Sequence, residues 1–66
     1  MKIVINSEER EFVNGVTLQE VLEKLSLENK VMAAAVNMDI VKESEWKNYK
    51  MSEGDKLELL DFVGGG

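Results

Sequence analysis

The sequence contains no cysteine, no histidine and no proline among its 66 residues. Without cysteine there is no disulfide, no thiolate nucleophile and no cysteine-ligated metal site. Without histidine the commonest general base and metal ligand is missing. Glycine is also scarce, with five residues, and three of these are the consecutive Gly64, Gly65 and Gly66. The chain therefore lacks the thiol nucleophile and the imidazole base that many enzymes use, and three of its five glycines are consecutive at one end.

The length and charge of the chain restrict its class further. Sixty-six residues form one small domain with a thin core. Eight basic and 13 acidic residues give a net charge of −5. Because phosphate backbones and anionic membranes repel such a chain, we expect neither a nucleic-acid partner nor membrane binding. The sequence shows neither a signal-peptide core nor the ~20 consecutive apolar residues that span a bilayer, so we expect a cytoplasmic location.

The first part of the sequence predicts a β-hairpin followed by a helix. Residues 1–6 read Met-Lys-Ile-Val-Ile-Asn, a β-branched segment with a period of two that is typical of a strand. A polar turn is expected at residues 7–10, and a second short strand at 11–13. Residues 17–20 read Thr-Leu-Gln-Glu, which is a capping box that begins a helix. An apolar stripe at helical spacing follows: Leu18, Val21, Leu22 and Leu25.

The second part of the sequence predicts further strands. Residues 31–36 are apolar, and their methionine and alanines have high helix propensity, so a second helix is one interpretation. They lack a helical stripe, however, and we expect a strand at 33–37. A short extended pair is expected at 40–41, a 3₁₀ turn within 43–49 and a last strand at 56–60.

The order β-β-α-β-β-β predicts an α+β domain. A hairpin, one helix and further strands form a mixed sheet of four to five strands with one main helix packed on one face. This arrangement is the β-grasp, or ubiquitin-like, roll. We expect residues 1–63 to form this domain and residues 64–66 to form a flexible glycine tail.

Two groups of side chains are candidates for chemistry. Carboxylates cluster at 8–11 and at 43–45, where a pair could act as general acid and base or hold Mg²⁺ or Ca²⁺ weakly. Both clusters lie in short polar segments, so we expect surface charge and assign no catalytic or metal-binding residue. Trp46 and Tyr49 could stack a nucleic-acid base, but the acidic balance favours a structural anchor that closes the core.

The three terminal glycines directly follow an apolar strand. They could be a frayed end or a cloning scar. Alternatively, the terminal carboxylate is the reactive group, and the glycines let it enter a narrow site on another protein. Alternation along the last strand would turn Leu57 and Leu59 toward the helix. It would turn Glu58, Leu60 and Phe62 outward. We therefore expect Leu60 and Phe62 to form a docking patch beside the tail.

Several short motifs together resemble the sulfur-carrier proteins of thiamine biosynthesis, the ThiS family. The resemblance covers nearly the whole chain and rests on Val36-Asn37, Ile40-Val41, Trp46, Gly54-Asp55-Lys56-Leu57 and the terminal Val63-Gly64-Gly65-Gly66. The Gly-Asp turn and the Gly-Gly end also occur in the small subunit of molybdopterin synthase. The Ile-Val pair with a Trp five residues later favours the thiamine branch. Two departures are Met38, where glycine is common, and Lys42-Glu43, where Pro-Arg often stands.

This resemblance implies a carrier and co-substrate rather than an enzyme, with no bound cofactor. An E1-like adenylating enzyme would use ATP and Mg²⁺ to convert the Gly66 carboxylate to an acyl-adenylate. A sulfur donor, such as a persulfide enzyme, would displace AMP and leave a thiocarboxylate on Gly66. Thiazole synthase would then take that sulfur into the thiazole ring of thiamine. The resemblance also implies that Gly65 tolerates no side chain.

Three other functions are compatible with the same residues. The chain could carry sulfur for molybdopterin or for another sulfur-containing metabolite. It could be a ubiquitin-like protein modifier, in which Gly66 forms an isopeptide bond with a target lysine. It could also be an acidic interaction domain whose glycine tail is inert.

Overall fold

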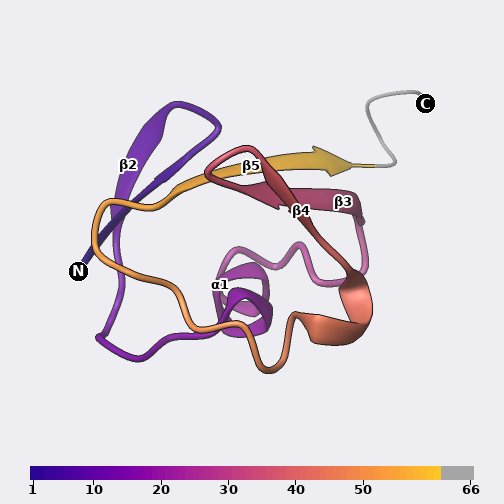
Figure 1. Cartoon of the computed structure of the whole chain (residues 1–66), viewed down its shortest axis with the longest axis horizontal. Helices are drawn as coiled ribbons and strands as arrows, with labels where there is room; N and C mark the ends of the chain where they lie inside the picture. Colours follow the sequence, from indigo (N-terminus) through magenta and orange to yellow (C-terminus); the bar gives the residue numbers. More distant parts are fainter. Residues whose placement is uncertain (62–66) are drawn as a thin grey trace.

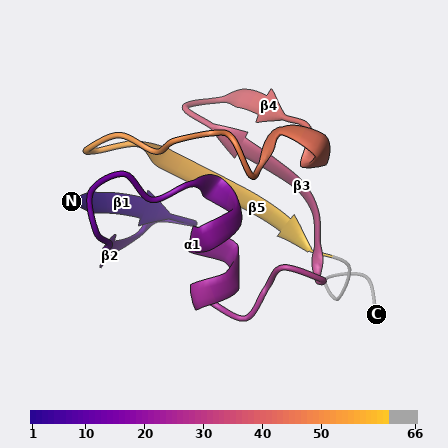
Figure 2. The same cartoon turned by 90° about the horizontal axis from the view of Figure 1, so that it is seen from below.

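The computed structural model describes residues 1–61, which form a five-stranded sheet with one helix on one of its faces (Figures 1 and 2). The elements are β1 (Lys2–Ile5), β2 (Glu8–Glu11), α1 (Leu18–Lys24), β3 (Val31–Val36), β4 (Asp39–Val41), a 3₁₀ turn (Glu43–Glu45) and β5 (Lys56–Asp61). The strand order is β2-β1-β5-β3-β4. Strands β1 and β5 run parallel and the other neighbours are antiparallel, so the predicted mixed sheet and the predicted order of elements are confirmed.

Helix α1 begins at the predicted capping box. The Thr17 hydroxyl accepts a hydrogen bond from the Glu20 amide at 3.2 Å, and the Glu20 carboxylate accepts one from the Thr17 amide at 2.9 Å. These two bonds satisfy amide groups that the first turn of a helix leaves free. Leu18, Val21 and Leu22 are buried in the core between α1 and the sheet. The apolar stripe therefore sets which face of the helix packs against the strands.

Trp46 closes the core at the end of the 3₁₀ turn. Its side chain is only 1% exposed, and its indole Nε1 donates a hydrogen bond to the Val41 carbonyl at 2.9 Å. Tyr49 is half-buried against the same core. The structural anchor is confirmed, because a buried indole has no face available to stack a nucleic-acid base.

The first hairpin differs from the prediction. The turn consists of Asn6 and Ser7 alone, and the second strand is Glu8–Glu11 rather than 11–13. Asn6 and Ser7 have φ values of 48° and 75°, which suit a two-residue turn whose twist matches that of the strands. Strand β2 is an edge strand, and all four of its side chains are exposed. Its charged residues have poor strand propensity, which the backbone pairing with β1 overrides.

Strand β3 is also longer than predicted at its start. It covers Val31–Val36 rather than 33–37, and the interpretation of this segment as a helix is wrong. A bulge between Val31 and Ala33 breaks the alternation of buried and exposed side chains, which hid the first residues of the strand. Asn37 belongs to the following turn with Met38, and both have positive φ values, 52° and 74°. This is a second two-residue hairpin turn, joining β3 to β4.

Residues of the sequence motifs meet where β3 ends and β5 begins. The side-chain amide of Asn37 donates to Asp55 Oδ1 at 3.0 Å, and its oxygen accepts from the Lys56 amide at 3.0 Å. Asp55 Oδ2 accepts from the Ser52 amide at 2.7 Å, which closes the turn at Gly54. Gly54 has a φ of +81°, a conformation that side chains disfavour. These motif residues thus hold β5 in place beside β3.

Candidate functional site

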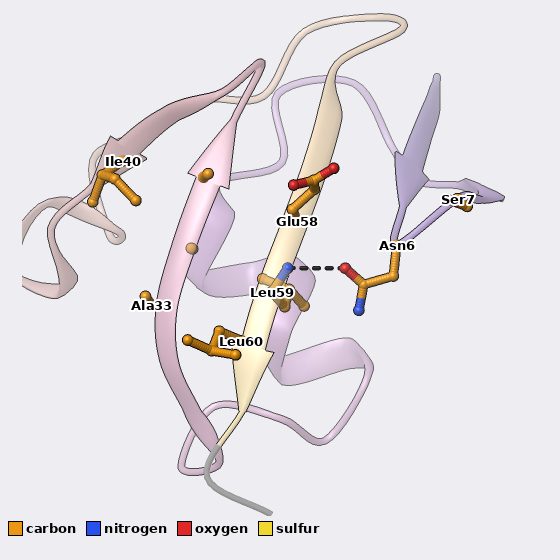
Figure 3. Close-up of a pocket in the computed structure, with 9 residues that line it drawn as sticks. Asn6, Ser7, Ala33, Ile40, Glu58, Leu59 and Leu60 are labelled. Carbon is orange, nitrogen blue, oxygen red and sulfur yellow. Dashed lines mark hydrogen bonds between the residues drawn. The ribbon is translucent and has the colours of Figure 1, made fainter. Parts of the chain in front are cut away.

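The face of the sheet opposite α1 carries an apolar patch. We define this outer patch as Ala33, Ala35, Ile40 and Leu60, which come from β3, β4 and β5. Ala33 is paired with Leu60, and Ala35 is paired with Ile40, so the four side chains share one face. Ile40 is 71% exposed and Leu60 is 61% exposed. Figure 3 shows this face with α1 behind the sheet. Exposed apolar side chains gathered on one face are typical of a docking surface.

Side chains along β5 alternate as the sequence predicts. Leu57 is fully buried and Leu59 packs partly against the core, whereas Glu58 and Leu60 are exposed. The predicted outward orientation of Leu60 is therefore confirmed. Its role in binding a partner stays a prediction. The other predicted site residues, Phe62 and Gly64–Gly66, lie outside the described residues, and so does the predicted boundary at residue 63.

Sequence reasoning missed three members of the outer patch. Ile40 was recognised as part of a short strand, but nothing in the local sequence places it near Leu60. The two residues are brought onto one face by β3, which lies between β4 and β5. Ala33 and Ala35 were expected in a strand without an assigned face. The register of the β3–β4 hairpin is the signal that could have found them, because its two-residue turn sets which residues pair.

A shallow hollow of about 460 Å³ lies over the outer patch, and all four residues of the patch line it. Its lining residues are Asn6, Ser7, Ala33, Ala34, Ala35, Ile40, Glu58, Leu59 and Leu60. Asn6 Oδ1 accepts a hydrogen bond from the Leu59 amide at 2.9 Å (Figure 3). This lining offers apolar surface, one carboxylate and a few neutral polar groups. Such a set suits recognition of another protein surface rather than bond cleavage.

The carboxylate clusters remain surface charge. In β2 the carboxylate of Glu8 lies 3.3 Å from the guanidinium of Arg10, and both side chains are exposed. Glu43 and Glu45 are exposed on the 3₁₀ turn. Within residues 1–61 no three acidic side chains are grouped so that they could hold a metal ion. The same part of the chain has no helix long and apolar enough to cross a membrane.

Comparison with known proteins identifies the family. The model of the ThiS family matches residues 3–66. The chain belongs to the ThiS family. The sulfur carrier protein ThiS of Escherichia coli is 30% identical over 66 residues, which is the whole of both chains. The predicted ThiS resemblance is thus confirmed.

Two further similarities concern the fold and the length. A crystal structure of a thiamine biosynthesis protein (ThiS) from Geobacter metallireducens superposes with a TM-score of 0.81 over the whole of both chains, at 21% identity. This match confirms the predicted β-grasp fold. A thiazole synthase of Paramagnetospirillum magneticum is 39% identical over 66 residues, and the chain spans 20% of that protein's length. The ThiS-family domain therefore also occurs as a segment of a longer protein.

Proposed function

We propose that this ThiS-family chain carries sulfur for thiamine biosynthesis as a thiocarboxylate on the carboxyl carbon of Gly66. The observation that carries this proposal is the family match, which extends over residues 3–66 and includes the glycine tail. The thiamine branch is favoured over a molybdopterin carrier because the E. coli relative named as a ThiS sulfur carrier aligns over its full length. The absence of cysteine and histidine fits this function, since a carrier needs neither a nucleophile nor a base of its own.

The chemistry requires activation by another enzyme. A carboxylate is a poor electrophile, because its negative charge is delocalised over two oxygens. In the proposed reaction, an E1-like adenylating enzyme with ATP and Mg²⁺ joins a Gly66 oxygen to the α-phosphate and releases pyrophosphate. A persulfide sulfur then attacks the carbonyl carbon and displaces AMP. A thiol cleaves the resulting S–S bond and leaves the thiocarboxylate. The carrier itself holds no cofactor and supplies only the acyl carbon.

Thiazole synthase is the proposed recipient of the sulfur. The P. magneticum protein of that name contains a segment similar to this whole chain. Joining a carrier to the enzyme that consumes its sulfur raises their effective concentration, so such a fusion supports a functional partnership. We place the reaction in the cytoplasm, where the proposed sulfur donor and adenylating enzyme would act.

The position of β5 in the sequence supports the proposed role. Strand β5 ends at Asp61, so only five residues separate it from the end of Gly66. Leu60 lies one residue before that end, within the outer patch. A partner that docks on the outer patch would therefore contact the strand that directly precedes residues 62–66 in the sequence.

Intact-mass spectrometry tests the proposal. The purified chain is incubated with its adenylating enzyme, ATP, Mg²⁺ and a persulfide donor. We expect a mass gain equal to replacement of one oxygen by sulfur, and fragmentation should map the change to Gly66. A variant with one serine added after Gly66 is the matched control, because it keeps the fold and moves the carboxylate. The enzyme preparation is first shown to adenylate another carrier. If the wild-type chain then gains no mass, the proposal is overturned. Conversion of the chain into lysine-linked adducts would identify a protein modifier instead.

A further inference from the structure

A single carboxylate interrupts the apolar face that the proposed function uses for docking. Glu58 lies on β5, exposed on the same face of the sheet as the outer patch. It is paired across the sheet with Ala35 and stands two residues before Leu60. Figure 3 shows its carboxylate on the side of the sheet away from α1, and both Glu58 and Asn6 line the hollow. A surface that covers Ala35 and Leu60 must therefore cover Glu58 as well.

Within residues 1–61 the Glu58 carboxylate forms no ion pair. Among residues 1–61 the only ion pair joins Arg10 and Glu8, which lie on the edge strand β2. Lys56 stands two residues before Glu58 on the same strand but forms no ion pair with it. Ala35, across the sheet, offers no polar group. Water therefore solvates the exposed Glu58 carboxylate in the free protein.

Covering this carboxylate with an apolar surface would be strongly unfavourable, because a charge that loses water needs a partner charge or several hydrogen bonds. The chain as a whole carries a net charge of −5, which attracts a basic surface and repels an acidic one. We propose that the adenylating enzyme covers the outer patch with an apolar surface that contains one arginine or lysine, and that this basic side chain pairs with Glu58. Glu58 is then a specificity-determining residue. The inference rests on the proposed function, which supplies the partner.

Substitutions at Glu58 separate this arrangement from a purely apolar contact. Binding of the full chain to the purified adenylating enzyme is measured by calorimetry without ATP. We expect Glu58→Gln to raise the Kd about tenfold or more and Glu58→Lys to raise it further. Glu58→Leu enlarges the apolar patch, so a purely hydrophobic interface predicts tighter binding. Our proposal predicts weaker binding, since the enzyme's cation would be buried without a partner.

A matched control and the salt dependence complete the test. Glu9→Gln removes the same charge from the same face of the sheet, but on β2, away from the outer patch, and should leave the Kd nearly unchanged. Added salt should weaken the wild-type complex more than the Glu58→Gln complex. Equal or tighter binding of Glu58→Gln and Glu58→Leu would overturn the inference. So would a complex in which the outer patch contacts a second copy of this chain.

The outcome is distinguishable from failure of the proposed function. At saturating carrier concentration Glu58→Gln should still be converted to the thiocarboxylate, with a raised KM and an unchanged kcat, because Glu58 lies eight residues from the reacting carbon. If the wild-type chain binds with the expected charge dependence but never gains sulfur, the proposed function fails and the docking inference stands. If the wild-type chain gains sulfur but its binding shows no dependence on the charge of residue 58, the docking inference fails and the proposed function stands.

Discussion

The side chain of Asn6 continues a strand pairing that the backbone of β1 no longer provides. Regular pairing of β1 with β5 ends at Ile5 and Leu57. One step further, Asn6 Oδ1 accepts a hydrogen bond from the Leu59 amide at 2.9 Å, although 53 residues separate the two in sequence. The bond lies at the last part of β5, just before the residues that lead to the tail. A turn residue of the first hairpin thus holds the strand that contributes Leu60 to the outer patch.

Replacing Asn6 should loosen this part of β5. Asn6→Gly keeps the positive φ without strain and removes only the side-chain bond, so we expect a loss of about 1 kcal/mol in the free energy of unfolding. Amide exchange at Leu59 should become faster by a larger factor than exchange at Ala34. Asn6→Asp is the control, since it keeps an acceptor oxygen and tolerates positive φ. Unchanged exchange at Leu59 in Asn6→Gly would show that the bond does not hold the strand.

Replacing Met38 should stabilise the domain. Met38 is 92% exposed and has a φ of 74°, so its side chain contributes little packing and strains the backbone. We expect Met38→Gly to raise the free energy of unfolding by about 1 kcal/mol, because Asn-Gly suits a two-residue hairpin turn. Urea denaturation followed by Trp46 fluorescence measures the change. Met38→Ala keeps the strain and should show no gain; equal stability of the two variants would contradict the prediction.

The contact between Asn37 and Asp55 should appear as a coupling energy. Asp55→Ala loses the bonds to Asn37 and to the Ser52 amide, and we expect it to cost about 2 kcal/mol of stability. Asn37→Gly loses its bonds to Asp55 and to the Lys56 amide without straining the turn. The double variant should lose about 0.5–1 kcal/mol less stability than the sum of the losses of the two single variants. Strict additivity would mean that the Asn37–Asp55 bond contributes nothing to folding.

A charge placed in the outer patch should disrupt binding but not folding. Leu60 is 61% exposed, so Leu60→Glu should leave the melting temperature within a few degrees of the wild type and weaken binding to the adenylating enzyme about tenfold or more. Val13→Glu is the matched control, because Val13 is 67% exposed but lies in the segment between β2 and α1. A large drop in melting temperature with unchanged binding would place Leu60 in the core instead of the interface.

Several features of the fold were predictable because neighbouring residues determine them. The start of α1 follows from a capping box of four consecutive residues, and the outward orientation of Leu60 follows from the two-residue period of a strand. The bounds of β2 were not predictable in this way. Its charged residues have low strand propensity, and only pairing with β1 makes them a strand. The start of β3 was obscured by its bulge.

By itself, the sequence of this chain determined its family and its order of elements, because short motifs carry that information. It also predicts that Gly66 is the reactive residue, because the chain has no cysteine and no histidine. The tertiary structure alone decided that Ile40 lies on the same face as Glu58 and Leu60. Those neighbours depend on strand order and register across the sheet. The order in which β4, β3 and β5 lie side by side arises from contacts between distant segments, so no local pattern reveals it.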